Sequence, residues 1–167
     1  MTDLDPVRRA ALIERYRAGH AAVVDALAGI TDAELDARPA GDGEWTPREV
    51  VHHMADSEMT SAIRLRRLIA EDNPIIVGYD GDEFARRLHY ADRPIGPSLD
   101  AVAAARSTTA DILDRLTEAE WQRTGTHTES GAYGVGQWLE IYASHAHDHA
   151  EQIRRARDEA ASRGGVG

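Results

Sequence analysis

Trp138–Arg155 reads WLEIYASHAHDHAEQIRR, and this stretch decides the fold that we expect for the chain. Its apolar residues recur at steps of three and four, and neither glycine nor proline interrupts them. That spacing places them on one side of an α-helix, whereas a strand would alternate apolar and polar residues. We therefore predict a helix over about residues 136–158 that buries a stripe formed by Leu139, Tyr142, Ala146, Ala150 and Ile153.

Three histidines lie within the same stretch. His145 and His149 are one helical turn apart and point the same way, whereas His147 lies about 200° round the helix from each of them. Two imidazoles one turn apart can hold a single divalent ion. The pair alone is a weak signal, because three histidines in five positions give one such spacing by chance. A metal site needs a third ligand from elsewhere in the chain.

A second helix, which also carries histidine, is predicted from Thr46 onward. Thr46-Pro-Arg-Glu49 combines a capping threonine, a proline at the first helical position and a glutamate that completes a capping box. The helix is expected to run to about Glu71. His53 lies on its inward stripe, and His52 is turned aside by about 100°. A histidine on such a stripe is either a metal ligand or a core residue with hydrogen bonds of its own.

The rest of the chain repeats this plan. Further long helices are predicted over residues 6–29 and 98–116, the latter capped by Ser98, and a short helix over 82–89. A Thr-x-Ala-Glu turn follows the first long helix and again the third, and Gly-x-Trp opens both the second and the fourth. The intervening residues 36–44, 72–82, 91–97 and 123–136 have the composition of loops.

We therefore predict an all-α fold, a four-helix bundle made of two pseudo-repeated helical hairpins. Bundles of this kind build metal sites between facing helices. If a pseudo-twofold axis relates the second and fourth long helices, His53 and the His145/His149 pair come from corresponding elements. The three histidines could then converge on one ion.

Composition limits the classes of function. The 167 residues fit one domain (1–167) with an ordered core over about 5–158. A net charge of -10 without a basic cluster argues against nucleic acid and anionic membranes as partners. The chain contains neither Lys nor Cys, which excludes lysine Schiff bases, disulfides and thiolate ligands. Residues 1–16 lack the apolar core of a signal peptide, and no apolar run approaches a membrane span, so we expect a cytoplasmic protein.

The ordered motifs resemble those of a known family. WTPREVVHHMADSE at Trp45–Glu58, followed much later by His145-x-x-x-His149, is similar to the DinB-like superfamily, and within it to the YfiT-like branch, which includes the bacillithiol transferases. Tyr79-Asp80, TESG at 128–131 and residues 138–142 share that likeness. The resemblance implies a four-helix bundle, a homodimer, and one divalent ion per chain, zinc or nickel, held by His53, His145 and His149. It assigns no metal to His52 or His147.

Three kinds of activity are compatible with this resemblance. One is transfer of a low-molecular-weight thiol, of the bacillithiol or mycothiol type, to an electrophile. The second is hydrolysis by a metal-bound water, and the third is metal binding by a stress-response protein without turnover. Because the chain has no cysteine, a reacting thiol has to arrive as a cosubstrate. A metal can lower the pKa of either a bound thiol or a bound water.

The remaining candidate residues are acids and loop residues near these motifs. Asp56 and Asp80 are candidate catalytic carboxylates. Tyr79, His127 and Glu129 lie in the two loops expected to close over the metal end, where they could recognise a polar cosubstrate or serve only as turn residues. Acids beside the histidines could orient an imidazole or could simply be solvated. Those acids and a neighbouring serine are Asp56, Ser57, Glu58 and Asp148.

Overall fold

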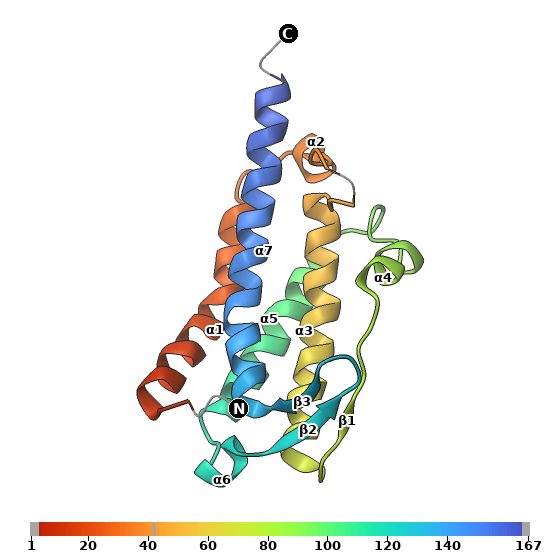
Figure 1. Cartoon of the computed structure of the whole chain (residues 1–167). Helices are drawn as coiled ribbons and strands as arrows, with labels where there is room; N and C mark the ends of the chain where they lie inside the picture. The colour runs from red at the N-terminus through yellow and green to blue at the C-terminus, as the bar shows by residue number, and fades with distance from the viewer. Residues whose placement is uncertain (1–3, 42, 165–167) are drawn as a thin grey trace.

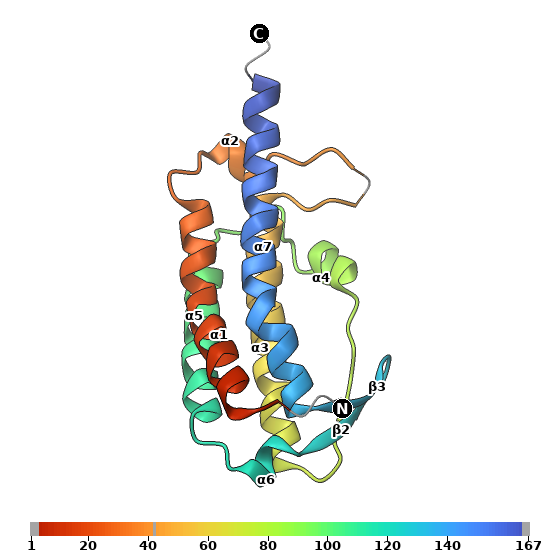
Figure 2. The same ribbon diagram turned by 60° about the vertical axis from the view of Figure 1, so that its left-hand side comes forward.

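The computed structural model describes residues 4–41 and 43–164, and four long helices dominate it (Figure 1). They are α1 (Pro6–Leu27), α3 (Pro47–Ala70), α5 (Gly96–Leu113) and α7 (Val135–Gly164). The predicted four-helix bundle is confirmed. α7 departs most from its predicted range, since it continues to Gly164 rather than ending near residue 158, and its last turns extend beyond the other helices (Figures 1 and 2).

Capping residues explain where two of these helices begin. Asp5 accepts a hydrogen bond of 2.9 Å from the backbone N–H of Arg8, and Thr46 forms the predicted capping box with Glu49. The prediction that Ser98 caps α5 is wrong. That helix already begins at Gly96, where Pro97 suits the first turn, and Ser98 is buried inside it.

The two halves of the sequence interleave in the bundle. α1 packs against α5 and α7, and α3 also packs against α5 and α7, so each long helix of one half lies between the two of the other half. Figure 1 shows α1 and α3 on opposite sides of α7. This arrangement sets α3 beside α7, and those are the two helices that carry the predicted histidine ligands.

Short helices mark the turns between the long ones. α2 (Asp32–Leu35) and α6 (Glu118–Trp121) each begin with a complete capping box, as the repeated Thr-x-Ala-Glu turn predicts. α4 (Gly81–Arg87) follows Asp80, whose side chain accepts hydrogen bonds from two backbone N–H groups. Of the described residues, none belongs to a helix that combines the length and apolarity needed to cross a bilayer.

A small sheet occupies two segments that we predicted as loops. β1 (Ile75–Ile76) pairs in parallel with β2 (Thr124–His127), which pairs in antiparallel fashion with β3 (Gly131–Gly134). The prediction of an irregular loop over 123–136 is therefore wrong. Glycine, serine and threonine dominate that segment, and its partner β1 is distant in sequence, so the strand pattern is too weak to recognise locally.

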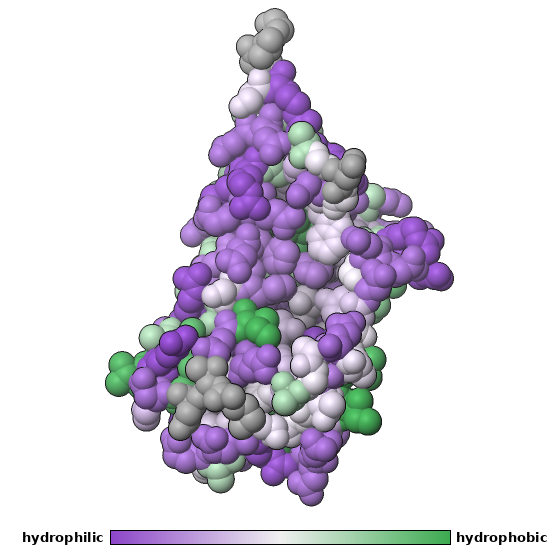
Figure 3. All heavy atoms as spheres, in the orientation of Figure 1, coloured by the Kyte–Doolittle hydropathy of each residue, from purple (hydrophilic) through white to green (hydrophobic). Residues whose placement is uncertain are grey.

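The bundle core is divided by a polar layer. One apolar cluster contains Tyr16, Leu65, Ala110 and Ala143, and a second contains Val23, Met54, Val102 and Ala146. On α1, α3 and α5, residues between these two sets contribute buried polar groups or a close helix contact. Those residues are Gly19 on α1, Glu58 and Ser61 on α3, and Arg106 and Thr109 on α5. On the face shown in Figure 3, hydrophobic side chains form separate small patches on a mostly polar surface.

Candidate metal centre

His53 on α3 meets His145 and His149 on α7. Each histidine offers one ring nitrogen, and the three nitrogens all lie within 4.8 Å of one another. The ring centroid of His53 is 5.5 Å from that of His145 and 4.8 Å from that of His149, and the two α7 rings are 4.5 Å apart. The structure therefore brings together the three residues predicted as ligands.

The spacing of the α7 pair matches that of two ligands on one ion. The Nε2 atoms of His145 and His149 are 3.2 Å apart. Two nitrogens that each lie about 2.0–2.1 Å from a tetrahedral ion are separated by roughly 3.3 Å. The i, i+4 register of α7 produces this spacing, and the capping box that starts α3 fixes the register of His53 opposite it.

Burial keeps two of the three imidazoles neutral. Burial, and after it the neighbouring His149 and His145, lower the pKa of His53 to about 3. The pKa of His149 falls to about 4, first because of burial and then because of His145. A neutral imidazole has a free lone pair at neutral pH, which a metal ligand requires.

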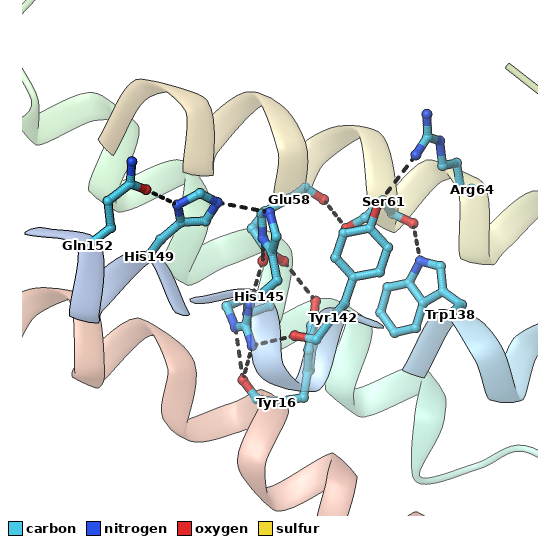
Figure 4. Close-up of polar contacts among 10 residues, drawn as sticks. Tyr16, Glu58, Ser61, Arg64, Trp138, Tyr142, His145, His149 and Gln152 are labelled. Atoms are coloured by element: carbon cyan, nitrogen blue, oxygen red, sulfur yellow. Dashed lines mark hydrogen bonds and ion pairs between the residues drawn. The ribbon is translucent and has the colours of Figure 1, made fainter. Parts of the chain in front are cut away.

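The outer ring nitrogens show how the α7 imidazoles are oriented (Figure 4). Nδ1 of His149 lies 2.8 Å from Oε1 of Gln152. An amide oxygen only accepts, so Nδ1 carries the proton and the lone pair on Nε2 is available to an ion. Nδ1 of His145 is buried and has no hydrogen-bond partner, and the carboxylate oxygen Oε1 of Glu58 is 3.8 Å away. Nδ1 of His53 is also buried without a partner.

This donor set fits a divalent ion that prefers nitrogen ligands. Three half-buried imidazoles converge, and the described residues add no fourth ligand to the group. Three protein ligands are typical of catalytic zinc sites, which keep a position for water or substrate, whereas structural sites close with four. The side chain of His145 is 20% exposed, so the group is not sealed from solvent.

Aromatic rings flank the histidines on both sides. The Trp45 ring lies 4.6 Å from that of His53, and its indole N–H donates to Asp82 over 3.2 Å. On the other side, the Tyr142 ring is 5.6 Å from that of His145. These rings limit the directions in which the imidazoles can turn.

The two histidines without a predicted metal role have structural partners instead. The ring of His52 contacts Ser98 Oγ at 2.8 Å and the backbone carbonyl of Arg93 at 3.1 Å. Nε2 of His147 lies 2.9 Å from the carbonyl of Arg15 on α1. Both residues therefore tie a neighbouring segment to their own helix.

The two candidate catalytic carboxylates are occupied by other groups. Asp56 accepts a hydrogen bond from the buried Tyr90 hydroxyl. Asp80 is exposed and caps α4, because its Oδ1 accepts from the backbone N–H groups of Asp82 and Glu83, each over 3.0 Å. Their catalytic role stays a prediction.

The candidate cosubstrate residues lie in neighbouring segments. Tyr79 packs against Phe84 with ring centroids 4.5 Å apart, and burial raises the pKa of its hydroxyl. The turn between β2 and β3 lies close to the Tyr79 segment. The carboxylate of Glu129 occupies the space that a Cβ on Gly78 would need. His127 accepts a hydrogen bond at Nδ1 from the backbone N–H of Glu129. The β2–β3 turn therefore lies against the loop that carries Tyr79, and contact of these residues with a cosubstrate stays a prediction.

Sequence reasoning missed two groups that the structure places at the site. Gln152 is three residues after His149 on α7, so helical spacing alone could have identified it. Arg106 comes from α5, and it pairs with Glu58 beside His145. No local sequence pattern links Arg106 to Glu58, because their contact depends on how α3 and α5 pack.

Comparison with known proteins agrees with this geometry. A family model described as the DinB superfamily matches residues 15–153. A protein of Geobacillus thermodenitrificans, named provisionally as a metal-dependent hydrolase, is 30% identical over 94% of this chain and 97% of its own length. An Oceanobacillus iheyensis protein with the same kind of name is 40% identical over 66% of this chain, and the match spans only 64% of that relative.

A solved structure resembles the whole bundle. YfiT from Bacillus subtilis superposes with a TM-score of 0.87 and 27% sequence identity, covering 99% of this chain and 92% of YfiT. YfiT is itself described, again provisionally, as a metal-dependent hydrolase with an unusual four-helix bundle topology. The interleaved helices and the histidine group thus occur in a chain that is similar over nearly its full length to proteins named for metal dependence.

Proposed function

Since this chain belongs to the DinB superfamily, we propose that it is a metal-dependent enzyme whose ion is held by His53, His145 and His149. The observation that carries the proposal is the convergence of three imidazoles with no fourth ligand among the described residues. A divalent ion such as zinc or nickel, once bound there, would supply a Lewis acid that lowers the pKa of a coordinated thiol or water.

We further propose that the activated group is a low-molecular-weight thiol of the bacillithiol or mycothiol type. Hydrolysis usually needs a carboxylate that takes a proton from the attacking water. The candidates for that role are engaged, since Asp56 accepts from Tyr90, Asp80 caps α4 and Glu58 pairs with Arg106. Thiol transfer makes no such demand, because a sufficiently acidic thiol reacts as its thiolate.

The proposed transfer can be written with its atoms balanced. The thiol loses its proton to solvent, and its sulfur forms a bond to the electrophilic carbon of the second substrate. The leaving group departs with the electron pair of the bond that breaks. Tyr79, His127 and Glu129, in the two adjoining segments, are proposed to contact the polar part of the thiol. We also propose that the chain acts as a homodimer.

The test is an assay of the metal-reconstituted protein with chloro-dinitrobenzene. It is run with bacillithiol, mycothiol, glutathione or no thiol, alongside a panel of esters and amides. We expect thiol-dependent conjugation that His149→Ala abolishes and His147→Ala retains, because the hydrogen-bond partner of His147 among the described residues is the Arg15 carbonyl. Ester or amide cleavage without thiol would replace this proposal with the hydrolase named for the relatives. Inactivity in every arm would favour a metal-binding protein without turnover.

A further inference from the structure

Glu58 stands out as a fully buried carboxylate at the centre of the bundle. It lies on α3 with no exposed surface and forms an ion pair with Arg106 of α5, which is 2% exposed. Its second oxygen accepts a hydrogen bond of 3.3 Å from the Tyr16 hydroxyl on α1. The first oxygen, Oε1, faces both the Arg106 guanidinium and Nδ1 of His145 (Figure 4).

Arg106 joins the remaining long helices to this carboxylate. Its Nε and Nη2 donate to the Tyr16 carbonyl over 2.8 and 2.6 Å, and Nη2 also donates to the Tyr142 carbonyl over 3.2 Å. The guanidinium lies 4.0 Å from the centroid of the Tyr16 ring. Gly19 permits this approach, because a Cβ there would lie 2.5 Å from Nη2 of Arg106. The network therefore reaches α7 one turn before His145.

Stability alone is a weak reason for such a pair. Removing two charges from water costs several kcal/mol per ion, and replacing a buried ion pair by apolar residues is often neutral or stabilising. Apolar clusters lie on both sides of Glu58 and Arg106, so apolar side chains would fit the surroundings. Apolar residues could not reproduce one feature of the pair, which is that Glu58 faces a ring nitrogen of the candidate ligand His145.

The two α7 histidines differ in what lies behind them. Gln152, a neutral amide, accepts from Nδ1 of His149, whereas the group behind Nδ1 of His145 is the Glu58 carboxylate. In metal sites a carboxylate behind a histidine fixes the ring orientation and raises the basicity of the ligating nitrogen. Nδ1 of His145 has no hydrogen-bond partner among the described residues, so the Glu58 carboxylate at 3.8 Å is the acceptor available to it.

We propose that Glu58, held in place by Arg106, is a positioning residue that orients His145 and strengthens its bond to the ion. This inference rests on the proposed metal centre. The buried polar groups that link α1, α3 and α5 then affect the metal centre through one imidazole, that of His145. Arg106 supplies the compensating positive charge, and the Tyr16 hydroxyl occupies the oxygen that His145 does not need.

The test compares zinc affinity and the visible spectrum of the cobalt-loaded protein in three variants. Glu58→Leu combined with Arg106→Leu removes both charges and leaves neither unpaired. Glu58→Gln keeps the shape of the side chain and leaves a neutral acceptor. Ser61→Ala, one turn further along α3, removes a buried hydroxyl that donates to the Glu58 backbone carbonyl and serves as the control.

We expect zinc affinity, measured by competition with a chromophoric chelator, to fall about 10–100-fold in the double variant and by a smaller factor in Glu58→Gln. The cobalt spectrum should change in both variants and remain that of the wild type in Ser61→Ala. Wild-type affinity and spectrum in a folded double variant would overturn the inference while leaving the metal centre intact. If the double variant does not fold, Glu58→Gln decides in the same way. A wild-type protein that binds no zinc would instead refute the metal centre itself.

Discussion

Adjacent histidines on α3 allow metal binding and folding to be separated by single substitutions. His53 faces the α7 pair, whereas His52 faces the segment before α5. His53→Ala removes one candidate ligand and leaves no hydrogen-bonding group without its partner, because Nδ1 of His53 has none. His52→Ala removes both contacts that hold Ser98 and the Arg93 carbonyl.

The magnitudes follow from these contacts. Four-ligand zinc sites bind with apparent free energies of about 10–16 kcal/mol, or about 2.5–4 kcal/mol per ligand, so His53→Ala should weaken zinc binding about 10²–10³-fold. The same substitution should lower the metal-free free energy of unfolding by only about 1 kcal/mol. His52→Ala loses two hydrogen bonds and leaves a cavity, which should cost about 2–4 kcal/mol of stability.

The assay pairs chelator competition with urea denaturation of the metal-free protein. We expect the two variants to behave in opposite ways. His53→Ala should lose zinc and keep its stability, whereas His52→Ala should lose stability and keep zinc. If His52→Ala lost the metal and His53→Ala kept it, the assigned register of α3 would be wrong by one residue. Equal effects of both substitutions on affinity would refute the separation of roles.

Two further predictions follow from the structure, and a third, the homodimer, follows from the family resemblance. In the unfolded chain the histidines take up protons below about pH 6.5. In the folded protein the pKa values of His53 and His149 are lowered to about 3 and 4, so these two histidines stay neutral at that pH. The urea midpoint of the metal-free protein should therefore be flat above pH 6.5 and fall towards pH 5, and it should fall less in a variant lacking both rings; an equal fall would contradict this. Gly19→Ala should cost about 1–3 kcal/mol by denaturation, because its Cβ would lie 2.7 Å from that of Ala146, whereas Gly96→Ala meets nothing within 4 Å and should be nearly neutral. Light scattering should show a dimer, and a purely monomeric protein would remove that proposal.

Local signals were sufficient for the long helices and for the register of the histidines, whereas the family resemblance assigned His53, His145 and His149 as one ligand set. The capping box at Thr46 fixed the register of α3, and the i, i+4 spacing fixed that of His145 and His149. Both depend on residues within one or two turns, which is the range over which helical geometry is set. The repeated plan of the two halves then placed the two helices in one bundle, in which the halves interleave rather than form separate hairpins.

Features that depend on distant contacts could not be predicted in this way. The pairing of β1 with β2 and the ion pair of Glu58 with Arg106 each join segments that are far apart in the sequence. Ser98 has the composition of a helix cap, but it lies opposite His52 and is buried there. In each case the partner is chosen by tertiary packing, which overrides the local preference.

X-ray absorption of the zinc-loaded protein, with and without thiol, tests whether the three histidines hold the ion and whether the ion binds the thiol. We expect three imidazole nitrogens at about 2.0–2.1 Å and no sulfur in the protein alone. Because the chain contains no cysteine, one sulfur at about 2.3 Å should appear only when bacillithiol or mycothiol is added. Fewer than three imidazoles would contradict the proposed ligand set, and an unchanged spectrum in saturating thiol would contradict activation of a thiol at this ion.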